Sequence, residues 1–275
     1  MTTHSYRISA EQRLSYAADG VIHLPGVLDA TWLQRLESAM VKLKEREMRD
    51  GAPEGFFDRQ RLWEIDLDFR NVVFDSPASS IAAQFLEVDT LNLLYDQAFI
   101  KAPASGVRTP WHNDLPNWPV RGEHLITVWV SLDPIGADNG MLEFARGSHR
   151  WGRWTPRPHT DIHGRITHFH IGEGEVGTQE EMQSDFASLE DEVAVAEIVS
   201  WETSPGDAIV FGALMIHGAI GNNRSDLNRR AYSMRFAGPD VRYHPLTASN
   251  AGIMSEDLAD GDPLSGKQYP VVYRQ

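Results

Sequence analysis

The chain of 275 residues contains no cysteine. Disulfides, thiolate metal sites and cysteine nucleophiles are therefore excluded, and any metal must be held by histidine and carboxylate side chains. Positive charge is scarce as well, since 25 lysines and arginines stand against 39 acidic residues and give a formal net charge of −14. Such a chain is a poor partner for nucleic acid or for an anionic membrane surface. A small anionic ligand is not excluded, because the local charge of a pocket can oppose the net charge.

Long apolar runs are missing too. No segment approaches the roughly 20 apolar residues of a membrane span, and the N-terminal stretch MTTHSYRISAEQRLSY has no apolar core of the signal-peptide type. We therefore expect a cytoplasmic protein that does not interact with membranes. The composition, with 41% hydrophobic and 23% charged residues, is that of a globular protein. Its length suits one large β domain or two small domains.

Residues 1–90 are expected to be mainly helical. The stretch SAEQRLSYAADG begins with a capping serine and stops at Gly20, which predicts a helix. A short strand is expected in VIHLPGVL, residues 21–28. Apolar residues at helical spacing follow in residues 29–49, and a weaker helix is expected over residues 79–87.

Residues 91–240 consist of short apolar segments separated by turn residues, which is typical of β strands. The segment DAIVFGALMIHG is interpreted as one strand that ends at His217, and Asn139–Gly140 is expected to form a hairpin turn. Many short strands after a helical N-terminus predict an antiparallel sandwich or jelly roll, with helices covering one sheet.

One domain is expected over residues 1–275, with residues 241–275 as a C-terminal tail. Residues 152–196 interrupt the rhythm of short strands and are rich in histidine, tryptophan and acidic residues. A segment of this length between two core strands is a candidate lid over an active site, and the alternative is a solvated surface excursion.

The stretch PWHNDLPNWP, residues 110–119, places His112 and Asp114 two positions apart. In an extended strand such residues point to the same face and can converge, either as a buried ion pair or as two ligands of a metal. His217 offers a third ligand from a distant strand. Two histidines and one carboxylate match the facial triad of non-haem Fe(II) oxygenases, which leaves coordination positions open for a cosubstrate and O2.

The stretch RRAYSMRF follows His217 and supplies a candidate anion site. A 2-oxoglutarate cosubstrate chelates iron through its keto-acid end, so its other carboxylate needs a distant cation, and the planar fork of arginine suits this task. Strand alternation places Arg229, Ser233 and Arg235 on one face, where small residues leave room for a ligand. Arg230 falls on the opposite face, which is expected to pack against helices. This favours Arg229 for 2-oxoglutarate and leaves Arg230 as the alternative.

In these residues the chain resembles the phytanoyl-CoA dioxygenase (PhyH) family of Fe(II)/2-oxoglutarate oxygenases. The resemblance runs over most of the chain and is carried, in order, by DGVIHLPGVLD, PWHNDLPNWP, VWVSLDPIGADNGMLEFARGSH, PGDAIVFGALMIHG, RRAYSMRF and DGDPLSGKQYPVVY. It implies a double-stranded β-helix in which His112, Asp114 and His217 bind iron and Arg229 binds 2-oxoglutarate.

The resemblance also concerns several neighbouring residues. It implies that Trp129 lines the cosubstrate pocket, and Trp118 matches a tryptophan that lines the pocket in the related ectoine hydroxylases. Core packing is the alternative for both tryptophans. His149 is expected to belong to the scaffold. Halogenating relatives replace the carboxylate ligand with a small residue, so the retained Asp114 implies hydroxylation or another oxidation.

The sequence thus predicts an Fe(II)/2-oxoglutarate-dependent dioxygenase that oxidises a small-molecule metabolite with O2 and releases succinate and CO2. Hydroxylation is the expected outcome, and desaturation and demethylation stay open. The alternatives are a cupin-like isomerase or hydrolase that uses the same ligands without 2-oxoglutarate, and a β-sandwich binding module. Arg235 and Lys101 are expected in surface ion pairs rather than in a substrate site. The sequence indicates neither the substrate's identity nor an oligomeric state.

Overall fold

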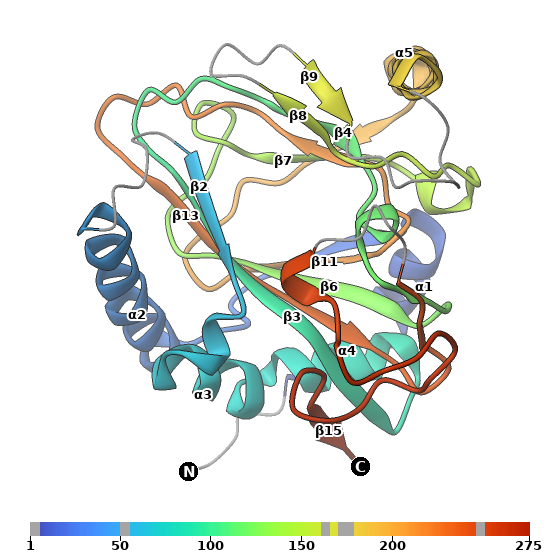
Figure 1. The fold of residues 1–275 in the computed structure, drawn as a ribbon. Helices are drawn as coiled ribbons and strands as arrows, with labels where there is room; N and C mark the ends of the chain where they lie inside the picture. The colour runs from blue at the N-terminus through green and yellow to red at the C-terminus, as the bar shows by residue number, and fades with distance from the viewer. Residues whose placement is uncertain (1–5, 50–55, 161–165, 170–178, 246–250) are drawn as a thin grey trace.

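The computed structural model describes residues 6–49, 56–160, 166–169, 179–245 and 251–275. Two antiparallel sheets face each other, and helices cover the outer side of the larger sheet (Figure 1). In spatial order the larger sheet consists of β1 (Val21–Leu24), β11 (Ala208–Gly212), β6 (Leu125–Ser131), β13 (Arg229–Ala237), β3 (Thr90–Lys101) and β15 (Val271–Arg274), with β2 (Phe56–Gln60) also paired to β3.

The smaller sheet has the order β10 (Ile198–Val199), β7 (Leu142–Ala145), β12 (His217–Ala219) and β4 (Thr109–His112). Two short pairs lie outside both sheets: β5 (Val120–Arg121) with β14 (Arg242–Tyr243), and β8 (Pro158–Thr160) with β9 (Ile166–Phe169). The predicted jelly-roll arrangement, a double-stranded β-helix with helices on one sheet, is confirmed.

The helices are α1 (Ala10–Asp19), α2 (Ala30–Arg49), α3 (Leu67–Asp75), α4 (Pro77–Leu86) and α5 (Gln179–Val195), and short 3-10 turns occupy η1 (Leu62–Glu64), η2 (Leu115–Asn117), η3 (Ser148–Arg150) and η4 (Ala251–Ile253). A capping box starts α1, because the Ser9 side chain accepts from the Gln12 amide and the Gln12 side chain accepts from the Ser9 amide. Gly20 ends the same helix with a φ of 80°. The predicted helical N-terminal part is confirmed, whereas α3 and β2 were not anticipated.

The two faces of β13 have different roles. Tyr232, Met234 and Phe236 are fully buried in the core between the larger sheet and the helices, and the Tyr232 ring stacks on Phe69 of α3 with centroids 5.1 Å apart. Burial of each side chain of this size contributes about 1.5–3 kcal/mol to folding. Because this face holds the sheet against the helices, the other face of β13 is left for the space between the sheets.

The apolar segment DAIVFGALMIHG forms two strands rather than one. It runs along β11 in the larger sheet, turns after Gly212, where the amide of Met215 donates to the Gly212 carbonyl, and continues as β12 in the smaller sheet. His217 therefore begins a strand instead of ending one. Hydrophobicity does not reveal this bend, because Ala213, Met215 and Ile216 of the turn are as buried as the strands on either side.

Asn139 and Gly140 do not form the expected hairpin, since the flanking strands β6 and β7 belong to different sheets. The buried Asn139 side chain closes the crossing loop instead, accepting from the amide of Gly136 at 2.6 Å and donating to the carbonyl of Pro134 at 2.7 Å. A turn dipeptide specifies a local reversal, and only the sheet arrangement decides where the chain goes next.

The described parts of the candidate lid, residues 152–196, lie beside the smaller sheet and include β8, β9 and α5 (Figure 1). Residues 161–165 and 170–178 of the candidate lid fall outside the described residues. Leu189 and Val193 of α5 are buried against the sheet. Arg153 ties the helix down through Asp185 and Glu192, with N–O distances of 2.6 and 2.5 Å. Across the described residues, the helices are each too short or too polar to cross a bilayer.

Candidate active site

Three potential metal ligands meet between the sheets. His112 on β4 and His217 on β12 are paired across the smaller sheet, and their ring centroids lie 4.3 Å apart. The Oδ1 atom of Asp114 lies 3.8 Å from His112 Nε2 and 4.0 Å from His217 Nε2. All three residues are buried, and one ligand atom from each falls within 4.8 Å of the others. Such spacing leaves room for one cation between two imidazoles and a carboxylate.

The backbone prepares both histidines as ligands. Nδ1 of His112 donates to the carbonyl of Pro110 at 2.8 Å, and Nδ1 of His217 donates to the carbonyl of Met215 at 2.9 Å. These bonds select the tautomer in which the Nε2 lone pair faces Asp114. Burial lowers the pKa of both rings, that of His112 well below its usual value. Both imidazoles are therefore neutral at pH 7, and the donor set fits Fe(II) or a similar divalent metal.

Strand alternation does not explain the position of Asp114 beside the two histidines. His112 is the last residue of β4, and Asp114 has helical backbone angles (φ −79°, ψ −36°) at the start of η2. Asn113 between them is fully buried, and its side chain holds the carbonyl of Arg153 and the amide of Thr155, at 2.7 and 3.0 Å. The expected convergence is found, but a turn anchored by Asn113 produces it.

Two basic side chains lie next to each other on the inner face of the larger sheet. Arg229 of β13 and Lys101 of β3 are cross-strand partners, and each is 2% exposed. Burial, and then the charge of Arg229, lower the pKa of Lys101 to about 6, and burial lowers that of Arg229 to about 10. Lys101 donates to the carbonyls of Ile220 and Val107, at 2.9 and 3.3 Å. The expected surface ion pair of Lys101 is therefore wrong.

Arg229 is arranged to receive an anion. Its Nε atom is buried and has no hydrogen-bond partner within the described residues, and its guanidinium carbon lies 5.7 Å from the centre of the Trp129 ring. Buried N–H groups of this kind are costly unless they are paired, so a carboxylate bound here would gain a strong contact. Arg230, by contrast, faces outward and holds Asp133 through contacts of 2.6 to 3.1 Å. The alternation predicted for β13 is confirmed.

The other residues named from the sequence take different places. Ser233 lies opposite Trp129 on the inner face, and its buried hydroxyl has no partner among the residues described. Trp118 is packed in a core cluster and donates from Nε1 to the Tyr95 hydroxyl at 2.8 Å. Its contacts match the core-packing alternative, and a pocket role for it stays a prediction. His149 packs beside Gly20, apart from the triad, as expected of a scaffold residue.

Arg235 lies in the interior, not at the surface. The residue is 5% exposed, its Nε atom lies 3.8 Å from Oδ2 of Asp114, and its guanidinium carbon sits 4.4 Å from the centre of the Tyr95 ring. The expected surface ion pair is therefore wrong. The signal was present, because Arg235 is six residues beyond Arg229 on the same alternating face.

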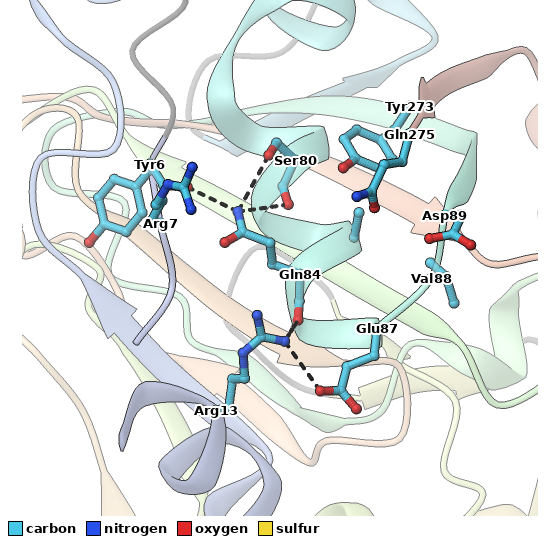
Figure 2. A pocket seen from close by; sticks show the side chains of 11 residues that line it. Tyr6, Arg7, Arg13, Ser80, Gln84, Glu87, Val88, Asp89, Tyr273 and Gln275 are labelled. Carbon is cyan, nitrogen blue, oxygen red and sulfur yellow. Dashed lines mark hydrogen bonds and ion pairs between the residues drawn. The ribbon is translucent and has the colours of Figure 1, made fainter. Parts of the chain in front are cut away.

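A cleft of about 490 Å³ lies elsewhere, between the N-terminal segment, α4 and the C-terminal strand (Figure 2). Its polar groups bind one another: the Gln84 side chain donates to the carbonyls of Tyr6 and Ser80, while Arg13 donates to the Gln84 carbonyl and pairs with Glu87. This cleft is on the helix-covered side of the larger sheet, away from the triad. The hydrogen bonds of Gln84 attach the N-terminal segment to α4.

Comparison with known proteins gives one family. The sequence profile of the phytanoyl-CoA dioxygenase (PhyH) family matches residues 16–231. A probable phytanoyl-CoA dioxygenase of Caenorhabditis elegans is 25% identical over 165 residues, which are 58% of this chain and 47% of the relative. The match thus spans about half the length of that relative.

Two solved structures share the fold over almost their whole length. The non-heme alpha ketoglutarate dependent carbocyclase SnoK from nogalamycin biosynthesis has a TM-score of 0.72 and 21% identity, over 96% of both chains. The epimerase SnoN, in complex with Fe3+, alpha ketoglutarate and nogalamycin RO, has a TM-score of 0.67 and 19% identity, over 94% of this chain and 96% of that one.

Proposed function

The chain belongs to the phytanoyl-CoA dioxygenase family, and from this premise we propose that it hydroxylates a C–H bond of a small-molecule metabolite with Fe(II), 2-oxoglutarate and O2. The family resemblance predicted from the sequence motifs is confirmed, and with it the assignment to the iron- and 2-oxoglutarate-dependent oxygenases.

One observation carries the proposal: two neutral imidazoles, each oriented by a backbone carbonyl, and one carboxylate converge on a single buried point. His112, Asp114 and His217 would hold the metal. Iron bound there, with 2-oxoglutarate and O2, supplies an oxidant able to attack an unactivated C–H bond while 2-oxoglutarate becomes succinate and CO2. The protein contributes orientation and the exclusion of water around this chemistry.

The buried basic side chains indicate where 2-oxoglutarate would bind. Arg229 and Lys101 would bind the carboxylate of 2-oxoglutarate that is distant from the metal, with Trp129 and Ser233 lining the same face. A hydrolase or isomerase that works without 2-oxoglutarate has no use for a buried arginine beside a buried lysine that becomes charged when a carboxylate binds. The charge of this pocket opposes the net charge of −14, as an anionic ligand requires.

Residues 152–196 are proposed to close over the substrate as a lid of a single domain. Arg153 holds α5 through two ion pairs, and the carbonyl of Arg153 accepts a hydrogen bond from Asn113. Because Asn113 lies between His112 and Asp114, these contacts join the segment to two of the metal ligands. We expect that binding of metal and substrate slows amide hydrogen exchange in α5. Exchange that is the same in the free and ligand-bound protein would contradict the lid.

Metal binding tests the proposed function directly. The replacements His112→Ala and His217→Ala should each abolish stoichiometric binding of Fe(II) under anaerobic conditions, because two remaining ligands compete poorly with water. His124→Ala is the matched control, since its side chain is 39% exposed and pairs with Asp240 outside the triad. Succinate formation by the unmodified protein should require added 2-oxoglutarate. Full iron content and turnover in either triad variant would remove the assignment.

A further inference from the structure

Arg235 is a buried cation without the hydrogen bonds that such a group needs. Its Nε and Nη1 atoms are inaccessible to solvent and have no hydrogen-bond partner in the part of the chain that the structure describes. A buried charge is expensive unless it is paired. Among the ion pairs of the described residues, its single carboxylate partner is Asp114, at 3.8 Å between Nε and Oδ2.

The surroundings hold this guanidinium in place. It lies 4.4 Å from the centre of the Tyr95 ring and 5.8 Å from that of Phe99, within the range of cation–π attraction. Tyr95 is itself fastened, because its hydroxyl accepts from Nε1 of Trp118 at 2.8 Å. The aromatic side chains therefore act as a wall that keeps the charge of Arg235 beside Asp114.

The two oxygens of Asp114 face different groups. Oδ1 is the atom that approaches both imidazoles, at 3.8 and 4.0 Å. Oδ2 points to Arg235 and, among the described residues, accepts no hydrogen bond. Carboxylates bind metals through one oxygen or through both. Whichever group holds Oδ2 thus decides how many coordination positions Asp114 can occupy.

We propose that Arg235 is a positioning residue that holds Oδ2 of Asp114, so that only Oδ1 faces the metal. This keeps open the coordination positions that 2-oxoglutarate and O2 require, and the inference rests on the proposed function. Groups that orient metal ligands from behind change metal affinity by about 10–100-fold when removed. The two arginines on the inner face of β13 then have separate tasks, since Arg229 binds the cosubstrate and Arg235 orients a ligand.

The test uses Co(II) as a metal probe on the full-length metal-free protein. We expect Arg235→Gln to raise the Kd for Co(II) by about 10–100-fold, because the Asp114 carboxylate is no longer held in position. The visible d–d absorption should change as well, because Oδ1 no longer faces the metal in a fixed orientation. Arg235→Met, which can pack on the Tyr95 ring without charge, should do the same. Arg235→Lys should restore part of the affinity, since it keeps the charge and loses the fork. Circular dichroism verifies that each variant is folded.

Arg230→Gln is the matched control, because it removes a paired arginine from the outer face of the same strand. Its Kd and Co(II) spectrum should equal those of the unmodified protein. A Kd and a spectrum that stay unchanged in folded Arg235→Gln or Arg235→Met would overturn the positioning role. Failure of the unmodified protein to bind Co(II), or full binding by His112→Ala, would instead remove the proposed function.

Discussion

Replacement of Arg229 should selectively weaken binding of 2-oxoglutarate. The side chain is 2% exposed, and its Nε atom has no partner in the described structure. Truncating one member of a buried, hydrogen-bonded charge pair costs about 2–5 kcal/mol. At about 1.4 kcal/mol per tenfold change, this corresponds to a Kd raised by about 30-fold to 4,000-fold. Because Lys101 stays beside the same site, we expect Arg229→Gln to fall near the lower limit, at about 30- to 100-fold.

The assay is calorimetric titration of 2-oxoglutarate into Co(II)-loaded protein without O2. Arg229→Lys should recover part of the affinity, because it keeps the charge but loses the bidentate fork. Arg230→Gln should bind like the unmodified protein, since that side chain is held by Asp133 on the outer face. A large loss at position 230 with none at 229 would refute the reasoning and show that the faces of β13 are assigned the wrong way round.

Gly140 provides an independent probe of the same contact. Its φ is 90°, and a Cβ atom built there would lie 2.8 Å from Nε of Arg229. Gly140→Ala should therefore displace the guanidinium and weaken 2-oxoglutarate binding without removing any charge. Unchanged affinity in a folded Gly140→Ala protein would mean that the position of Arg229 does not matter for the cosubstrate.

Two further predictions concern pH. Burial and the charge of Arg229 lower the pKa of Lys101 to about 6. Because a bound carboxylate favours the ammonium form, binding of 2-oxoglutarate at pH 7.5 should be accompanied by proton uptake. The affinity for 2-oxoglutarate should also increase as the pH falls toward 6. Titrations in buffers of different ionisation enthalpy should reveal this uptake, and Lys101→Met should eliminate it; equal enthalpies in all buffers would contradict the prediction. Burial raises the pKa of Asp96 from 3.8 to about 6. The folded state therefore binds a proton at Asp96 more tightly than the unfolded chain does. This proton stabilises the fold at low pH, and the stabilisation is lost as the pH rises from about 4 to 6. The free energy of unfolding of Asp96→Asn, measured in urea, should therefore rise relative to that of the unmodified protein by about 2 kcal/mol between pH 4 and 7.5. If the difference in unfolding free energy between the two proteins were constant across this range, Asp96 would not be destabilised by burial.

Local signals in the sequence were sufficient for several elements. The capping serine and the glycine at the end of SAEQRLSYAADG predicted α1, because capping depends only on neighbouring residues. The alternation of RRAYSMRF predicted which arginine faces inward, since side chains on a strand alternate whatever the partner strands are. The same is true of the chemical nature of the metal site, which follows from residue types and the absence of cysteine.

The long-range arrangement was read less well. DAIVFGALMIHG looks like one strand because residues 208–216 in it are all apolar or small. Its division between two sheets depends on where the partner strands β6 and β7 lie. Asn139–Gly140 has the composition of a hairpin turn, yet it joins strands of different sheets. A local pattern cannot encode such choices, because they depend on contacts between segments that are far apart in the chain.

By itself, the sequence determined the family, the helical start, the strand-rich remainder and the residues able to bind a metal. Only the tertiary structure decided the environment of the charges. Lys101 and Arg235 look like ordinary surface cations in the sequence, but the two facing sheets bury both. The physical reason is that charge is a property of a residue, whereas desolvation is a property of the place to which the fold brings it. That placement turns Lys101 into a partner of Arg229, and Arg235 into a neighbour of Asp114.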